Sequence, residues 1–267
     1  MGQNLTPNVK ILLLINLLIF GAVNLIHSID VVALLGYHYP KSEYFQVFQP
    51  FTYMFVHRDF AHIFSNMFAL FIFGPMLENV LGSKRFLILY LVTGLGGGAL
   101  YGLVNFVEIH QMEASAAQFI LSSTPENFLA FCQDHAEVYL QHNTTLYNFA
   151  ESIFPADPNN PGLQKEAVEF ARKITIDRMN IPMIGASGAI FGILFTFAYL
   201  FPNLRLMLLF PPIPIKAKYL VGAYILYETY ELINQNPADN VAHLAHLGGA
   251  LFAYLLMRHW KYQSYQN

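Results

Sequence analysis

Long apolar stretches separated by short polar connections make up most of the chain. A bilayer core about 30 Å thick needs around 20 apolar residues per helix. Six stretches approach that length, and we predict that each is a membrane-spanning helix: approximately residues 9–27, 59–77, 86–106, 184–201, 217–233 and 241–257. The fifth is the weakest, because Glu228 and Glu231 interrupt it. The pattern therefore predicts an all-α polytopic membrane protein, with six helices forming one membrane domain over residues 1–267.

Two segments between the predicted spans do not fit a membrane crossing. Residues 28–56 are aromatic and are interrupted by Pro40 and Pro50, which is typical of a segment lying in the membrane interface. Residues 107–180 contain ten acidic and four basic residues. We expect them to form a soluble helical insertion between the third and fourth spans. Within it, Thr124-Pro125 is a helix-start pattern, and a further helix is expected over about residues 163–179.

The composition agrees with a membrane protein and excludes several other classes. Apolar residues make up 55% of the chain and charged residues 12%, about half the charged share of an average soluble domain. The net charge of −3 gives no sign of a nucleic-acid-binding surface. The single cysteine, Cys132, excludes an intrachain disulfide and a cysteine-rich metal site.

The positions of the basic residues predict how the chain is oriented. With six spans, the bases in the short connections and at the two ends all fall on one side of the membrane: Lys10, Lys84, Arg85, Arg205, Lys216, Lys218, Arg258 and Lys261. The positive-inside rule makes that side cytoplasmic, so both termini are expected there and the 107–180 insertion outside. The first apolar stretch lacks an obvious cleavage site, so we predict a retained span. The compact core favours a bacterial inner membrane, with an organelle membrane as the alternative.

A serine and a histidine on two predicted spans are candidates for a catalytic pair. Ser187 is near the outer end of the fourth span, and His243 and His246 are in the outer half of the sixth. Spans four and six run in the same direction, so Ser187 and His246 are expected at similar depth. A serine becomes a good nucleophile when a positioned base takes its proton, and imidazole is the usual base. A plainer interpretation is that Gly188 and Gly192 form a helix-packing face with Ser187 as one more small residue.

The second span carries two further polar residues near the same outer end. His62 and Asn66 are four residues apart and therefore share one helical face. An amide or an imidazole N–H can stabilise the oxyanion that forms when a serine attacks a peptide carbonyl. The alternative is that both residues only form hydrogen bonds between helices. Glu78 and Asp239 are not placed to complete a catalytic triad, so a dyad is the simpler expectation.

The chain resembles the rhomboid family of intramembrane serine proteases. The matching elements are His62-xxx-Asn66, Gly185-Ala186-Ser187-Gly188, Ala245-His246-Leu247-Gly248-Gly249, and Leu77-Glu78 followed by Gly82-Ser83-Lys84-Arg85-Phe86. Their order, spacing and sidedness agree with those of the family, with the last motif at the second cytoplasmic turn, and together they cover the core outside the insertion.

The resemblance implies a rhomboid-like six-helix bundle that cleaves transmembrane segments of other membrane proteins. Ser187 would be the nucleophile and His246 the base, while His62, Asn66 and the backbone N–H of Ser187 would form the oxyanion hole. Structural or packing roles are implied for Gly185, Gly188, Phe191, Gly249, Ala253 and Glu78. Residues 28–56 would be the membrane-embedded first loop, and the fifth span the mobile wall through which substrate enters.

The chain departs from the family pattern in three places. Val47-Phe48-Gln49 stands roughly where many relatives have a Trp-Arg pair, so the anchoring of the first loop is expected to differ. Phe191 stands where relatives often have a tyrosine against the catalytic histidine, and a phenyl ring can still stack there. The acidic insertion at 107–180 replaces a shorter connection.

Serine chemistry requires no cofactor or metal, and the expected partners are single-span membrane-protein substrates and the lipid bilayer. Two other functions stay open. One is a non-catalytic rhomboid-like protein that binds membrane proteins. The other is a metal-dependent membrane enzyme or ion transporter that uses His62, His243 and His246 as ligands, although the sequence has no His-Glu-x-x-His motif and no obvious carboxylate ligand within a span.

Overall fold

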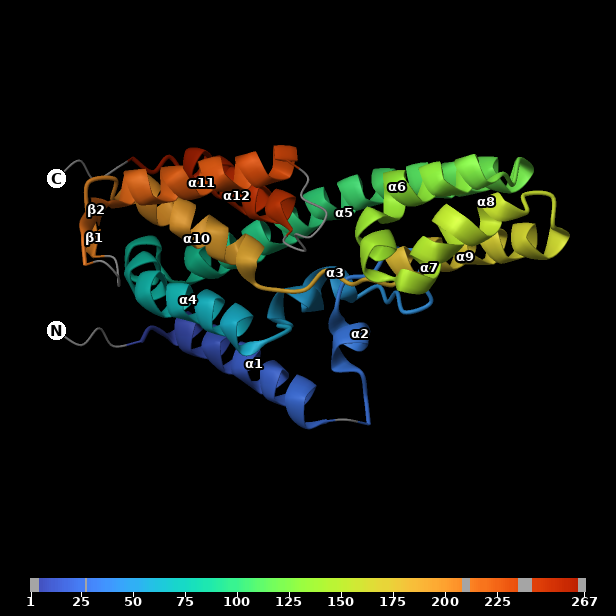
Figure 1. The fold of residues 1–267 in the computed structure, drawn as a ribbon. Helices are drawn as coiled ribbons and strands as arrows, with labels where there is room; N and C mark the ends of the chain where they lie inside the picture. The colour runs from blue at the N-terminus through green and yellow to red at the C-terminus, as the bar shows by residue number, and fades with distance from the viewer. Residues whose placement is uncertain (1–4, 27, 208–211, 235–241, 264–267) are drawn as a thin grey trace.

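Six helices form the bundle that positions the candidate site (Figure 1). The computed structural model describes residues 5–26, 28–207, 212–234 and 242–263. The bundle helices are α1 (Pro7–Leu25), α4 (Phe60–Leu81), α5 (Ser83–Leu121), α10 (Ser187–Leu200), α11 (Ala217–Asn234) and α12 (His243–His259). Helix α12 packs against α5 and α10, which also contact each other, and α4 packs against α1 and α10. Each predicted span therefore contains a helix.

The bundle helices differ in how well they suit a membrane crossing. Among the described residues, α1, α4 and α5 are long and apolar enough to cross a membrane. Helix α10 is apolar but has 14 residues. Helix α12 has 17 residues, and α11 carries Lys218, Glu228 and Glu231. Length and composition thus identify three spanning helices rather than six.

Helix α5 continues without a break from the bundle into the insertion. Its 39 residues end at Leu121, well past the predicted end of the third span at 106. At 1.5 Å per residue the helix is about 58 Å long, nearly twice the roughly 30 Å of a bilayer core. The chain has no proline between residues 76 and 124 to interrupt it.

The insertion is helical and has its own hydrophobic core. Its elements are α6 (Pro125–His142), α7 (Thr144–Asn148), the π-helical turn η2 (Phe149–Ile153), α8 (Phe154–Ala156) and α9 (Pro161–Met179). Helix α6 begins where the sequence predicts, with the Thr124 side chain accepting a hydrogen bond from the Asn127 N–H. Buried aromatic residues, including Phe128, Phe149 and Phe154, fill the core. The insertion lies at the end of the bundle opposite the start of α1 and the end of α12 (Figure 1).

Residues 28–56 form a folded loop held by one glutamine. Its short helices are α2 (Val31–Leu35), α3 (Gln49–Thr52) and the 3-10 turn η1 (Tyr53–Phe55). Gln49 is fully buried. Its side-chain amide donates to the carbonyl oxygens of Ala33, Leu34 and Tyr44, and its Oε1 accepts from the His38 N–H. Gln49 is part of the segment 47–49, which stands roughly where many relatives have a Trp-Arg pair. It therefore anchors this loop through neutral hydrogen bonds.

One short hairpin was not part of the all-α prediction. Strand β1 (Arg205–Met207) pairs antiparallel with β2 (Pro214–Lys216) in the connection between α10 and α11. Three-residue strands are too short for an alternating pattern to identify them. The chain is mostly helical, with this one small sheet among the described residues.

Candidate active site

Ser187 is the first residue of α10, and the backbone before it has an unusual conformation. Gly185 has a φ of +120°, which side-chain-bearing residues rarely adopt. A Cβ at Gly185 would lie 2.7 Å from His62 Nε2 and 3.8 Å from Ser187 Oγ. Position 185 therefore requires glycine for both conformation and space. Ser187 and His62, from α10 and α4, therefore both lie close to Gly185.

The beginnings of α10 and α12 are in close contact, which brings the neighbours of Ser187 and His246 together. A Cβ on Gly188 would lie 3.3 Å from the Ala245 carbonyl oxygen. A Cβ on Gly249 would overlap the Gly188 carbonyl oxygen. Ser187 is half-buried and His246 is buried. These contacts hold the first turns of α10 and α12 side by side. Ala253, one turn after Gly249 on α12, is fully buried.

The predicted stack of Phe191 on His246 is present. The ring centroids are 4.3 Å apart and the planes are 6° from parallel. Phe191 also contacts Tyr224 of α11 at 5.5 Å between centroids. One face of the imidazole is therefore covered by an aromatic ring from α10, the helix that carries Ser187.

A carboxylate does contact His246, contrary to the expectation that no acidic residue is placed to complete a triad. Glu228 Oε2 lies 2.9 Å from His246 Nδ1 and 2.6 Å from His243 Nδ1. Glu228 belongs to α11 and is 4% exposed. Of the two carboxylates weighed from the sequence, Glu78 lies away from this contact and Asp239 lies outside the described residues, whereas Glu228 was taken only as a defect in the fifth span. The expectation was wrong because the packing of α11 against α12 turns this carboxylate toward both histidines.

The same three residues are the group best suited to a metal among the described residues. One donor atom each from Glu228, His243 and His246 lies within 4.8 Å of the others. The metal hypothesis named His62, His243 and His246 as ligands and found no obvious carboxylate ligand within a span. In the structure, Glu228 takes the place of His62 in this group. The ligand atoms of a tetrahedral zinc site lie about 3.3 Å apart, as follows from bonds of about 2.0 Å. The two contacts of Glu228 are shorter than that and have the lengths of hydrogen bonds.

His62 and Asn66 lie on consecutive turns of α4, as their spacing predicts. Asn66 is buried, and its side-chain amide donates to the His62 carbonyl oxygen at 3.1 Å. The Asp59 carboxylate caps the start of α4 by accepting from the His62 N–H. His62 is half-buried, and its ring lies close to Gly185. The structure thus brings His62 to Ser187 and places Asn66 one turn further along the helix.

His57 is a neighbour of the site that was not predicted from the sequence. Its ring is fully buried and meets the His62 ring edge to face, with centroids 4.8 Å apart. Burial lowers the pKa of His57 to about 3, so its ring is neutral at neutral pH. His57 precedes α4, where no helical periodicity links it to His62. A second histidine five residues before His62 was the only available signal.

Glu78 contacts the start of α1 rather than the site. Its carboxylate accepts hydrogen bonds from the backbone N–H groups of Asn8 and Val9 and from the Ser83 hydroxyl. The first N–H groups of a helix have no partner within the helix, and a carboxylate is well suited to them. Glu78 therefore ties the start of α1 to the turn between α4 and α5.

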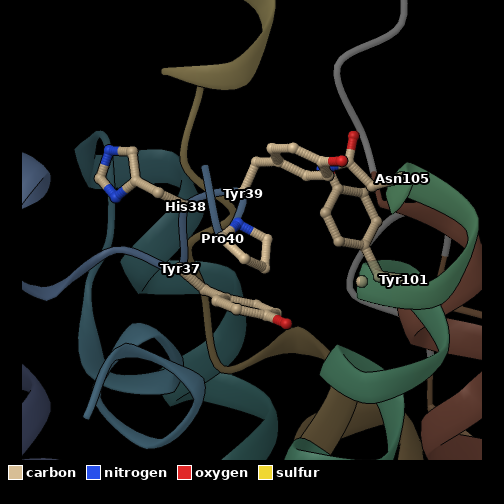
Figure 2. Close-up of a pocket in the computed structure, with 7 residues that line it drawn as sticks. Tyr37, His38, Tyr39, Pro40, Tyr101 and Asn105 are labelled. Atoms are coloured by element: carbon tan, nitrogen blue, oxygen red, sulfur yellow. The ribbon is translucent and has the colours of Figure 1, made fainter. Parts of the chain in front are cut away.

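A small pocket elsewhere is separate from these residues (Figure 2). It is lined by residues 37–40 and by Tyr101, Gly102 and Asn105 of α5. The Tyr39 hydroxyl and Asn105 Oδ1 are buried and lack a protein partner. No predicted site residue lines this pocket, so it is not part of the candidate active site.

Comparison with known proteins identifies the family to which the chain belongs. The family model for the rhomboid domain matches residues 44–120 and 165–260, and the chain therefore belongs to the rhomboid family of integral membrane proteins. The unmatched residues between these ranges fall within the insertion.

Individual relatives are distant. The chain is 27% identical over 203 residues to "RHOMBOID-like protein 12, mitochondrial" of Arabidopsis thaliana, covering 76% of this chain and 43% of that protein. It is 30% identical over 115 residues to "RHOMBOID-like protein 1" of the same plant, covering 41% of this chain and 29% of that protein. The matches thus span less than half the length of these relatives.

Proposed function

We propose that the protein is an intramembrane serine endopeptidase that cleaves transmembrane segments of other membrane proteins. The observation that carries this proposal is the convergence of Ser187, His62 and His246 at the starts of three helices, α10, α4 and α12. Membership of the rhomboid family, whose members are generally serine proteases, supports it.

In the proposed reaction, Ser187 Oγ attacks the scissile carbonyl carbon while its proton passes to His246 Nε2. The carbonyl oxygen becomes an oxyanion, which the side chains of His62 and Asn66 and the backbone N–H of Ser187 stabilise. The C–N bond then breaks, and the leaving amine takes the proton from His246. Water hydrolyses the acyl-enzyme by the same route in reverse. Ser187 begins α10, so its N–H has no partner within that helix and suits this role.

The proposed topology has six spans with both termini in the cytoplasm. Helices α11 and α12 are then spans in which Glu228, His243 and His246 lie among protein groups rather than lipid, which is how ionisable groups are tolerated in membranes. The insertion lies on the outer side. We propose a bacterial inner membrane; one plant relative is named as a mitochondrial protein, and an organelle membrane is the alternative.

The proposed substrates are single-span membrane proteins whose helix unwinds near its outer end. A helical peptide bond is shielded by its own backbone hydrogen bonds, so the segment must unwind before Ser187 can attack it. The candidate residues lie at the ends of α4, α10 and α12 nearest the insertion (Figure 1), so cleavage is expected near that face of the membrane.

A non-catalytic binder of membrane proteins would need neither a nucleophile nor a positioned base. Two features favour the enzyme instead. Gly185 lies close to Ser187, and the Phe191 ring stacks on His246.

Cleavage of a panel of single-span membrane proteins in liposomes tests the proposal. The native chain is compared with Ser187→Ala and His246→Ala, and Ser65→Ala, an exposed serine one turn along α4, is the matched control. We expect cleavage by the native chain and by Ser65→Ala, and none by the two site variants. Cleavage that survives Ser187→Ala would exclude the serine mechanism, and binding without cleavage by the native chain would favour the non-catalytic function.

A further inference from the structure

The Glu228 carboxylate connects two histidines through a single oxygen atom. Both Nδ1 atoms, from His243 and His246, are within hydrogen-bond distance of Oε2. An ionised carboxylate only accepts hydrogen bonds, so each of these ring nitrogens carries the proton. A neutral His246 is then protonated on Nδ1 and has its lone pair on Nε2. That is the form a general base needs if it is to take the proton of Ser187.

We propose that Glu228 is the positioning residue for His246 and completes a Ser187–His246–Glu228 arrangement. This inference rests on the proposed function and deepens it by assigning a third residue to the same site. Glu228 selects the Nδ1–H tautomer of His246 and stabilises the positive charge that the ring acquires when it takes the serine proton.

Two contacts from different helices together determine the position of the His246 ring. The stack with Phe191 of α10 sets the plane of the ring. The hydrogen bond to Glu228 of α11 sets its rotation within that plane. His243, one turn before His246 on α12, binds the same carboxylate oxygen and holds it in place. His243 therefore acts on His246 through Glu228, since their ring centroids are 6.3 Å apart.

The carboxylate belongs to a helix that is only lightly packed. Among its 18 residues α11 buries only Ala217, Val221 and Glu228. Its large apolar side chains, such as Leu226 and Ile233, are exposed and suit a lipid-facing surface. Any movement of α11 away from α12 carries Glu228 away from His246. The base is therefore oriented only while α11 is docked, which links the position of this helix to catalysis.

The contact lengths fit this role without a metal ion. Contacts of 2.6 Å and 2.9 Å between the carboxylate oxygen and the two ring nitrogens are hydrogen bonds as they stand. A metal would require the same atoms to separate to about 3.3 Å. Metal dependence is therefore an outcome that would overturn the proposal.

The experiment measures kcat and KM for cleavage of one single-span substrate in liposomes by four full-length variants. They are Glu228→Gln, Glu228→Asp, Glu231→Gln and Ser187→Ala. Glu231 is the matched control, because it is an acidic residue three positions further along α11. Labelling with a fluorophosphonate probe reports the reactivity of Ser187 independently of substrate, and the thermal unfolding midpoint reports folding.

We expect Glu228→Gln to lower kcat by about 10²-fold, at the low end of what general-base catalysis contributes, with KM changed by less than about twofold. Probe labelling slows in parallel. Glu228→Asp keeps more activity than Glu228→Gln because it retains the charge, although glutamine is closer in size. Glu231→Gln resembles the native chain.

Four results would overturn the inference. The first is a native kcat in Glu228→Gln, and the second is higher activity in Glu228→Gln than in Glu228→Asp. The third is an effect of Glu228→Gln on KM alone, and the fourth is loss of activity when a chelator is added to the native protein. If Ser187→Ala still cleaves, the proposed function fails as well. If Ser187→Ala is inactive and Glu228→Gln is native-like, only the role of Glu228 fails. If the thermal midpoint shows that Glu228→Gln is unfolded, the kcat of Glu228→Asp is compared with that of Glu231→Gln to test the role of Glu228.

Discussion

The Phe191 ring lies face to face with the His246 ring, with centroids 4.3 Å apart and planes 6° from parallel. Phe191 is four residues after Ser187 on α10, so both side chains project from the same face of that helix. The helix that carries the predicted nucleophile therefore also holds the predicted base. Relative motion of α10 and α12 is limited by the same contact that orients the imidazole.

Removing the Phe191 ring should slow catalysis more than it weakens binding. A stacked aromatic pair contributes about 0.5–1.5 kcal/mol beyond its buried area, so we expect Phe191→Ala to lower kcat roughly 3- to 10-fold. Phe191→Tyr keeps the stack and should stay within about twofold of the native chain. Phe195→Ala is the control, because Phe195 is on the same helix but contacts Tyr199 and Tyr254. Equal kcat values for Phe191→Ala and Phe195→Ala would show that the stack does not matter.

A methyl group at position 249 should force α10 and α12 apart. A Cβ there would overlap the backbone carbonyl oxygen of Gly188, which cannot rotate away as a side chain can. Overpacking of this kind typically costs about 1–3 kcal/mol. We expect Gly249→Ala to lower the thermal unfolding midpoint and to abolish most cleavage, because Gly188 is the residue after Ser187. Gly21→Ala, at a helical position with open space around it, should be neutral or slightly stabilising. Equal midpoints for the two variants would contradict the close packing.

The sequence predicted the parts of the site that depend on one helix or on span direction. The closeness of the helix starts that carry Ser187 and His246 was expected from two spans that run the same way, and the stack of Phe191 on His246 was implied by the family resemblance. Glu228 was not predicted, because its contacts depend on how α11 docks against α12. A signal existed, since an acidic residue inside an apolar stretch is a functional candidate by default. The continuation of α5 past residue 106 was missed because apolar content falls there while helix-forming residues continue.

The buried ring of His57 should make folding sensitive to acid. Burial holds its pKa at about 3, against an ordinary value of 6.5. Between these values the unfolded chain binds a proton that the folded chain does not. Stability therefore falls as pH falls from 6.5 toward 3, by about 1.4 kcal/mol per pH unit for this group.

His57→Phe removes that titration and can keep the edge-to-face contact with His62. We expect the thermal midpoint of the native chain to drop more between pH 7 and pH 4.5 than that of His57→Phe. His142→Phe, at an exposed histidine in the insertion, should follow the native chain. Identical acid sensitivity in all three proteins would show that His57 does not contribute.

The only cysteine of the chain should report whether the core of the insertion is folded. Cys132 is fully buried on α6 among the aromatic residues of that core, and burial raises its pKa to about 12. Maleimides react with the exposed thiolate, so both its burial and its low ionisation protect this side chain. We expect no labelling of the native protein at pH 7.5 and complete labelling in denaturant. Gln133→Cys in a Cys132→Ala background places a thiol on the exposed face of the same helix and should label at once.

Rapid labelling of native Cys132 would mean that the insertion opens readily. If heating exposes Cys132 before cleavage is lost, the insertion unfolds independently of the bundle that holds Ser187 and His246.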